Sequence, residues 1–112
     1  MAAAALDGDA VALCVSHTGR SREIVDAADA AARAGATVVA LTAPGSPLAG
    51  RATVLVPVEV EEDTDLYTPM ASRLAHLAVG DALAVAAALL SPPAAEARLA
   101  RMKDALRARR LP

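Results

Sequence analysis

Three short apolar segments constrain the fold more than any other feature of this sequence. Ala10–Val15, Thr37–Thr42 and Thr53–Pro57 are rich in apolar and β-branched residues and show no polar alternation. Strands of that kind are covered on both faces, as in parallel sheets flanked by helices. Between the first two segments, Ser21–Ala34 carries apolar residues at helical spacing and is followed by Gly35, a residue typical of helix ends. The pattern predicts a β-α-β unit with parallel strands.

The second half of the chain is expected to be mainly helical. Ser46–Arg51 predicts a short helix before the third strand, and Thr68–Leu90 predicts a long helix that opens with an N-cap threonine and a proline. After Leu77 the long helix is apolar almost all round, so we expect it to be buried in the domain or in an oligomer interface. Ala94–Arg109 predicts a last helix.

The fold class that follows is α/β: a three-layer α-β-α arrangement on a parallel, flavodoxin-like sheet, ending in two α-helices. Three strands are few for such a sheet, since doubly wound sheets usually have five or six. We therefore expect the domain to be truncated at its N-terminus.

Length, charge and cysteine content exclude several classes of protein. The chain has 112 residues, enough for one small domain, and 55% of them are apolar, although one residue alone is aromatic. A net charge of −2 provides no field that attracts nucleic acid or a membrane surface. Cys14 is the single cysteine, so an internal disulfide is impossible, which suits a reducing cytoplasm. The longest apolar run, Ala82–Leu90, is too short to span a bilayer, so we expect a cytoplasmic protein without a membrane partner.

A polar loop directly follows the first strand. Ser16, Thr18 and Ser21 supply hydroxyl groups, Gly19 allows the backbone to turn, and two arginines add positive charge. In parallel sheets this position, at the end of a strand and the start of a helix, favours anions such as phosphate. The alternative is that Thr18 or Ser21 merely caps the helix. The loop matches neither a P-loop nor a dinucleotide fingerprint, so a nucleoside triphosphate is not expected.

The segment from Gly8 to Val58 resembles the second half of a sugar isomerase (SIS) domain. That family has a strand, the loop S-x-S/T-G-x-T/S, a helix, a Gly-Ala turn and a strand that leads into T-N/A-x-x-S-P-L-A. The matching residues are Ser16, Thr18, Gly19, Ser21, Gly35, Thr42, Ser46, Pro47, Leu48 and Ala49. The resemblance implies a phosphosugar-binding domain whose serine-rich loop holds the phosphate.

A later motif narrows the resemblance. The run "TDLYTPMASRLAHL", followed by Asp-Ala-Leu, is similar to the effector domain of RpiR/HexR-type transcriptional regulators, as is the closing helical segment. The resemblance implies a sensor for carbohydrate metabolism that binds a phosphorylated sugar or sugar acid resembling 2-keto-3-deoxy-6-phosphogluconate. In that family DNA is bound by an N-terminal helix-turn-helix headpiece, and a first-strand serine loop adds to the phosphate site. We expect both to be absent from this chain.

The domain organisation expected from the resemblance is one partial SIS domain over residues 1–112, with a C-terminal helical extension at 91–112. We expect a homodimer or a higher oligomer, formed through the apolar helix after Pro69. A second copy would then cover the exposed sheet edge that such a small sheet leaves open.

The resemblance also extends the candidate site to the start of the long helix, where the alternative is an ordinary exposed helix end. His17, in the loop, is a candidate for direct ligand contact or for solvent exposure, whereas His76 is expected to have a packing role. The candidate ligand-binding residues are Ser16, His17, Thr18, Gly19, Ser21, Ser72 and Arg73. No metal site, cofactor or catalytic residue is predicted. An SIS-type aldose–ketose isomerase is the alternative function, although no carboxylate aligns with its base.

Overall fold

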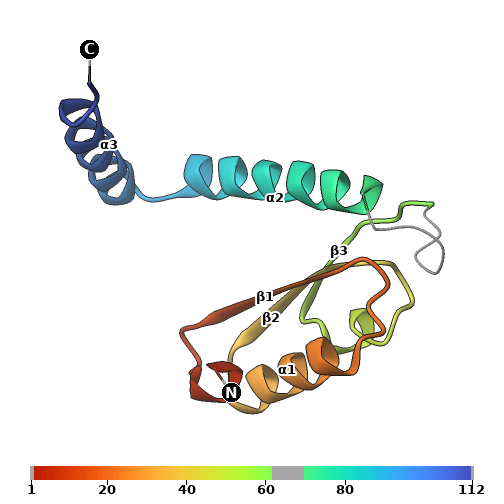
Figure 1. Ribbon diagram of the computed structural model, residues 1–112. Coiled ribbons are helices and arrows are strands. Elements are labelled where there is room, and N and C mark those ends of the chain that lie inside the picture. The colour runs from red at the N-terminus through yellow and green to blue at the C-terminus, as the bar shows by residue number, and fades with distance from the viewer. Residues whose placement is uncertain (1, 62–69, 112) are drawn as a thin grey trace. The chain divides into compact units, whose positions relative to one another are not determined.

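The computed structural model describes residues 2–61 and 70–111 (Figure 1). Its elements are the 3₁₀ helix η1 (Ala2–Ala5), strand β1 (Val11–Ser16), helix α1 (Arg22–Arg33), strand β2 (Thr37–Thr42), the 3₁₀ helix η2 (Ala49–Arg51), strand β3 (Val54–Pro57), and helices α2 (Ala71–Leu90) and α3 (Pro93–Ala108). The predicted order of strands and helices is confirmed, and the chain has an α/β fold. The N-cap threonine and the proline expected at 68 and 69 lie outside the described residues.

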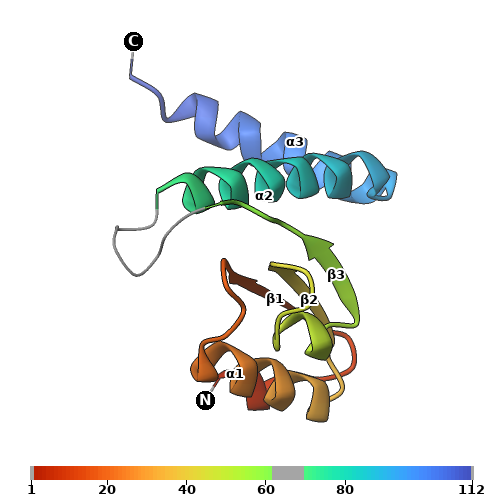
Figure 2. The same cartoon turned by 90° about the vertical axis from the view of Figure 1, so that its right-hand side faces the viewer.

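The three strands form a parallel sheet in the order β1-β2-β3. Ser16 at the end of β1 is paired with Thr42 at the end of β2, which in turn is paired with Pro57 at the end of β3. Helix α1 connects β1 to β2 and packs on one face of the sheet, as the two views in Figures 1 and 2 show. The register therefore brings the carboxyl ends of all three strands to the same edge.

Helix α1 ends at a glycine, as the sequence predicts. Ala34 is its C-cap residue, and Gly35 after it has a φ of +91°. The Gly35 N–H donates to the Ala32 carbonyl at 3.0 Å, and the Ala36 N–H donates to the Ala31 carbonyl at 3.1 Å. These paired bonds form a Schellman motif, which needs a residue that tolerates the left-handed conformation. The glycine thus lets the chain turn at once into β2.

The core lies between α1 and one face of the sheet and consists mainly of small residues. Ala28 and Ala31 of α1 and Val38 and Ala40 of β2 are fully covered, together with Leu48 beside them. Alanine lets the helix approach the sheet closely, but each alanine contributes little buried area. The free energy of unfolding therefore depends on many small contacts and on the few larger side chains, such as Leu48.

The other face of β1 is exposed. Val11, Leu13 and Val15 alternate with the covered Cys14 and are 63%, 56% and 47% exposed. Successive side chains of a strand point to opposite faces, so these three form one apolar strip away from α1. The sequence predicted apolar cover on both faces of the strand. On β1 the cover within the described residues lies on the α1 face. On the second face of the sheet, Leu41 of β2, the partner of Val15, is nevertheless 1% exposed.

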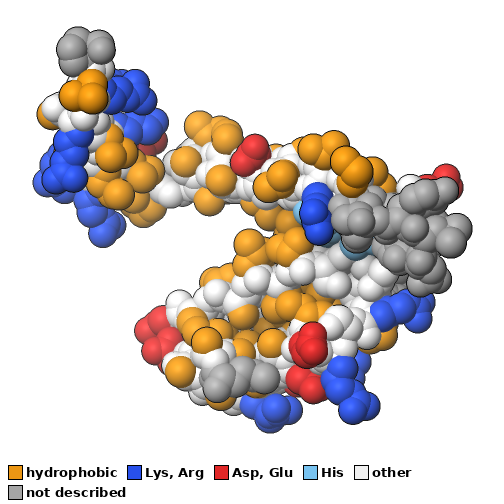
Figure 3. Space-filling model, viewed as in Figure 1, with side chains coloured by type: hydrophobic (Ala, Val, Ile, Leu, Met, Phe, Trp, Pro, Cys, Tyr) orange, Lys and Arg blue, Asp and Glu red, His pale blue; other side chains and the backbone are white. Residues whose placement is uncertain are grey.

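The chain divides into two compact units, Met1–Val79 and Gly80–Pro112, with the boundary inside α2. Along α2 hydrophobic side chains lie on the surface (Figure 3), and Leu74, Leu77, Val85 and Leu89 are between 59% and 76% exposed. By length and composition α2 could cross a membrane, with a mean hydropathy of 1.6, although core helices of soluble proteins meet the same criterion. In the part of α2 that belongs to the first unit, Ser72 is buried, whereas Leu74 and Leu77 are exposed.

Candidate functional site

The loop between β1 and α1 is organised by its own hydroxyl groups. The Gly19 N–H donates to the Ser16 Oγ at 3.1 Å, and the Arg20 N–H donates to the Thr18 Oγ1 at 3.4 Å. A hydroxyl that accepts a bond from the backbone keeps its own O–H available as a donor. Ser16 and Thr18 can therefore each donate one hydrogen bond to an acceptor outside the loop, and both lie at the carboxyl end of β1.

Gly19 packs against the neighbouring strand end so closely that a side chain would not fit. It has a φ of +63°, and a Cβ added there would lie 2.3 Å from the Ser46 Oγ and 2.5 Å from the Thr42 Oγ1. Its carbonyl accepts the Leu48 N–H at 3.0 Å. Both the left-handed conformation and the lack of space restrict this position to glycine, which accounts for the turn of the backbone predicted there.

The buried side chains of Thr42 and Ser46 pack against Gly19 of the loop. They are 0% and 6% exposed, their hydroxyl oxygens lie 3.4 Å apart, and the Ser46 Oγ accepts the Ala49 N–H at 3.2 Å. The sequence identified both as motif positions but not as members of the candidate site. Their contact with Gly19 depends on the pairing of β1 with β2, which places Thr42 next to Ser16.

The start of α1 is open towards the loop. Ser21 occupies the N-cap position, but its side chain makes no capping hydrogen bond and instead donates to the Glu23 Oε2 at 3.4 Å. The first N–H groups of a helix have no partner within the helix. Because Ser21 does not satisfy them, they remain available to an anion, and the exposed Arg20 and Arg22 flank them with positive charge. The alternative of Ser21 as a simple side-chain cap is not what the structure shows.

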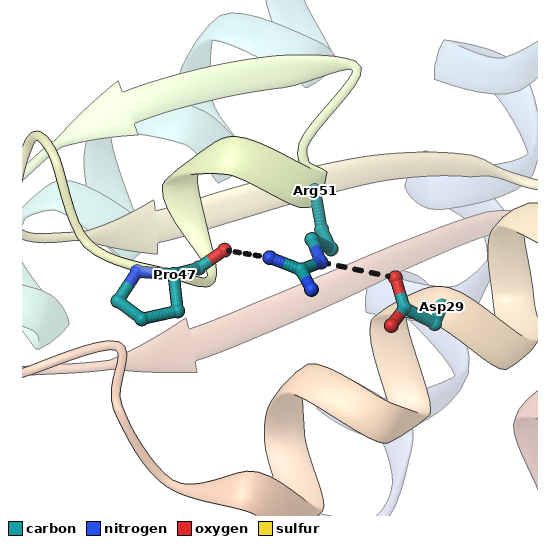
Figure 4. A network of polar contacts seen from close by, with 3 residues as sticks. All are labelled: Asp29, Pro47 and Arg51. Atoms are coloured by element: carbon teal, nitrogen blue, oxygen red, sulfur yellow. Dashed lines mark hydrogen bonds and ion pairs between the residues drawn. The ribbon is translucent and has the colours of Figure 1, made fainter.

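An ion pair joins helix α1 to the segment that connects β2 to β3. The Arg51 Nε lies 3.3 Å from the Asp29 Oδ1, and the Arg51 Nη1 donates to the Pro47 carbonyl at 3.4 Å (Figure 4). Pro47 and Arg51 belong to the connection that also carries Ser46, whereas Asp29 is on α1. The guanidinium thus bridges the two segments that flank the loop, and this residue was not expected from the sequence to have any role near the site.

Comparison with known proteins now adds to this geometry. The model of the SIS domain family matches residues 1–86, more than three quarters of the chain and all of the strands and the loop described above. The chain belongs to the SIS domain family.

This SIS domain is also similar to named bacterial proteins. It is 46% identical over 101 residues to the HTH-type transcriptional regulator HexR of Escherichia coli, and 43% identical over 98 residues to HexR of Pseudomonas aeruginosa. A match of 42% over 89 residues is to the bifunctional protein glk of Paraburkholderia xenovorans. These matches cover 90%, 88% and 79% of the chain but 35%, 34% and 14% of the relatives. The chain thus spans about a third of the length of the HexR proteins.

Among solved structures, the SIS domain is similar to the Vibrio vulnificus NanR protein complexed with ManNAc-6P. The TM-score is 0.78 and the identity 25%, over 95% of this chain and 40% of the other. The two HexR relatives are transcriptional regulators, and the structural neighbour shares the fold over nearly the whole length of the chain.

The remaining candidates of the SIS domain lie on α2. Ser72 is 2% exposed, whereas Arg73 next to it is exposed, so the two residues lie on different faces of the helix. His76 lies one turn after Ser72, close enough to His17 of the loop for their charges to interact. The structure therefore brings His17 and the covered face of α2 together within the unit Met1–Val79. Among residues 2–61 and 70–111 no hydrogen bond or ion pair is found between Arg73 and Ser16, Thr18 or Ser21, and the role of Arg73 stays a prediction.

The parts of the chain that the structure describes contain no group of three or more histidine, cysteine or carboxylate side chains that could hold a metal ion. Cys14 is a free, covered thiol, and burial raises its pKa above the usual value. The acidic stretch from 59 to 65 lies mostly outside the described residues.

Proposed function

We propose that this SIS domain is the effector-sensing part of an RpiR/HexR-type transcriptional regulator of carbohydrate metabolism, and that it binds a phosphorylated sugar or sugar acid. The identity with the two HexR proteins supports the type of regulator. The likeness to NanR, solved as a complex with ManNAc-6P, supports the class of ligand. DNA binding belongs in this proposal to the helix-turn-helix headpiece of such a regulator.

The observation that carries the proposal is the arrangement of donors around the loop. Ser16 and Thr18 accept bonds from loop N–H groups, which leaves their O–H groups free to donate. The uncapped start of α1 adds backbone N–H groups and the positive end of the helix dipole. Phosphate accepts several hydrogen bonds at once, so converging donors of this kind suit it better than a neutral ligand.

Glu23 is the one feature of the loop that opposes an anion. Its carboxylate receives the Ser21 hydroxyl at 3.4 Å, in the first turn of α1. A phosphate bound at this helix start would compete for that hydroxyl and would be repelled by the carboxylate. Since Glu23 is exposed and the repulsion is screened, we expect Glu23→Gln to tighten phosphosugar binding by a small factor of about two to three, as exposed charge pairs contribute at most about 1 kcal/mol.

Isothermal titration calorimetry with 2-keto-3-deoxy-6-phosphogluconate, ManNAc-6P and fructose 6-phosphate tests the function. We expect at least one of them to bind, and Ser16→Ala to weaken it about 10- to 150-fold, as for the loss of a hydrogen bond to a charged group. Ser91→Ala is the matched control, because Ser91 donates to the Ala87 carbonyl far along the sequence from the loop. The absence of heat with all three compounds, in a sample shown to be folded by circular dichroism, would contradict the proposal.

The same samples distinguish the sensor from the alternative, an SIS-type isomerase. An isomerase needs a base that moves a proton between neighbouring carbons. The proposal of a non-enzyme predicts that fructose 6-phosphate incubated with the protein stays unchanged by NMR. Conversion to an aldose phosphate that stops in Ser16→Ala would favour the enzyme.

We further propose that the domain acts as a homodimer or higher oligomer in the cytoplasm. The exposed apolar side chains of α2, among them Leu74 and Leu77, support this, since covering them with a second copy removes apolar area from water. Light scattering is expected to give at least twice the monomer mass, and Leu74→Asp to shift it to the monomer. Leu111→Asp, at a position 92% exposed, is the control. A monomer at all concentrations, with a cooperative melt, would argue against the oligomer.

A further inference from the structure

At the start of α2, within the first unit, one face of the helix is covered. Ser72 is 2% exposed and His76 follows it by four residues, which places both on the same face of the helix. Leu74 and Leu77 are 70% and 66% exposed on other faces. The covered face of the α2 start therefore carries a hydroxyl and an imidazole, while large apolar side chains beside it point outwards. Burial of hydrophobic area does not explain that choice of residues.

The ring nitrogens of His76 are buried but form no hydrogen bond within the part of the chain that the structure describes. Both of its ring nitrogens are shielded from solvent, and neither has a hydrogen-bond partner among residues 2–61 and 70–111. A neutral imidazole has one donor and one acceptor, and each of these groups destabilises the fold when it is buried without a partner. Buried polar groups in folded proteins are nearly always paired, so an unpaired one calls for an explanation.

The neighbour of His76 is the loop that the proposed function assigns to phosphate. His17 directly follows Ser16, and its backbone is fixed because its carbonyl accepts the Ala43 N–H at 3.3 Å. Burial lowers the pKa of His76, and the nearby His17 lowers it further. Arg73, one turn before His76, is a further cationic group on the same helix. Without an anion, therefore, a proton on His76 is disfavoured by both burial and like charge.

We propose that His76 is a second ligand-binding side chain of this site, which donates a ring N–H to an anionic oxygen of the bound sugar phosphate. The inference rests on the proposed function and deepens it. It places the start of α2 beside the β1–α1 loop in the site, and it gives one of the two unpaired ring nitrogens a partner. When no ligand is bound, burial and His17 disfavour the protonated form of His76. An anionic oxygen next to the ring would stabilise that protonated form.

Ligand binding then takes up a proton. The negative charge of the ligand favours the protonated form of a nearby imidazole, so binding raises the pKa of His76. By linkage, the affinity of the wild-type protein for the ligand increases as the pH falls from the pKa of His76 in the complex to its lower pKa in the free protein. The ligand phosphate itself has a second pKa of about 6. A His76→Gln variant retains the titration of the phosphate, so the difference between the two proteins isolates the histidine.

NMR titration of the histidine ring protons provides the test. The chain has two histidines, so His17→Gln and His76→Gln assign both signals. The probes are inorganic phosphate, ManNAc-6P and 2-keto-3-deoxy-6-phosphogluconate. We expect a probe that shifts the Gly19 amide signal to raise the pKa of His76 as well. His76→Gln is expected to weaken the binding of that probe about 10-fold or more, as for the loss of a hydrogen bond to a charged group. The affinity of this variant should depend on pH only through the titration of the phosphate, whereas that of the wild-type protein should show an additional dependence.

The possible outcomes separate the two proposals. If a probe shifts the Gly19 amide but leaves the pKa of His76 unchanged, the role of His76 is wrong and the phosphosugar site stands. If no probe shifts either signal at millimolar concentration in the folded wild-type protein, both are wrong. The pKa of His76 is measured in the wild-type protein, so the result does not depend on the folding of His76→Gln.

Discussion

Replacement of Gly19 by alanine tests the structural basis of the loop most directly. A Cβ at this position would lie 2.3 Å from the Ser46 Oγ, 2.5 Å from the Thr42 Oγ1 and 2.7 Å from the Ser46 Cβ. Thr42 and Ser46 are 0% and 6% exposed and are bonded to their surroundings, so neither side chain can simply turn away. The loop or the strand end must move to accept the methyl group.

Two contributions make up the expected loss of stability. The left-handed backbone conformation costs an alanine about 1–2 kcal/mol, and overpacking a covered contact costs a further 1–3 kcal/mol or so. We therefore expect Gly19→Ala to lower the free energy of unfolding by about 2–5 kcal/mol, against a total of roughly 5–15 kcal/mol for a domain. The variant should also lose phosphosugar binding, because the same loop carries Ser16 and Thr18.

Gly45→Ala is the matched control. Gly45 also has a positive φ, +74°, but a Cβ there would meet nothing within 4 Å. This variant keeps the backbone contribution of about 1–2 kcal/mol and lacks the steric one. In urea unfolding followed by far-ultraviolet circular dichroism, Gly19→Ala should unfold at a denaturant concentration roughly 0.3–3 M below Gly45→Ala, because a steric cost of about 1–3 kcal/mol is divided by slopes of about 1–3 kcal/mol per M. Equal midpoints for the two variants would refute the proposed contact with Thr42 and Ser46.

Further predictions concern three other groups. Cys14 should react slowly with a thiol reagent at pH 8 and rapidly in urea, since it is covered and burial raises its pKa; equally fast reaction in the folded protein would contradict its burial. The coupling between Arg51 and Asp29, measured by a double-mutant cycle, should be about 1 kcal/mol or less, because both side chains are partly exposed, at 44% and 35%; a value above about 2 kcal/mol would be inconsistent with a surface pair. The free energy of unfolding should fall as the pH drops from 7 through about 6.5, because the lowered pKa of His76 lets the unfolded chain bind more protons; the same fall in His76→Gln would exclude this origin.

The secondary structure was largely predictable because it depends on local sequence. The apolar runs around Cys14, Ala40 and Val56 became the three strands, and Gly35 ended α1 with the predicted left-handed conformation. The loop after β1 was also recognised from the sequence, because several hydroxyl residues and a glycine directly follow an apolar run there; its binding of phosphate is part of the proposed function. These features are encoded within a few residues of each other.

Contacts between distant segments were less predictable. The support of Gly19 by Thr42 and Ser46 requires the pairing of two strands, and the approach of His76 to His17 requires the tertiary placement of α2. A packing role was expected for His76, yet its unpaired nitrogens become visible only once burial and hydrogen bonds are known. Periodicity gives the face of a helix but not the groups that it meets.

The contacts around Gly19 have a mechanical consequence. The Gly19 carbonyl accepts a hydrogen bond from the Leu48 N–H, and the His17 carbonyl accepts one from the Ala43 N–H. The Ser46 side chain occupies the space next to the Gly19 Cα. The loop after β1 and the connection from β2 to β3 are therefore coupled, and a displacement of one is expected to strain the other. If the loop binds an effector as proposed, a shift of the loop on binding would be passed to this connection, which leads into β3. A change at Ser46, which is buried, would then alter the response to an effector without touching it.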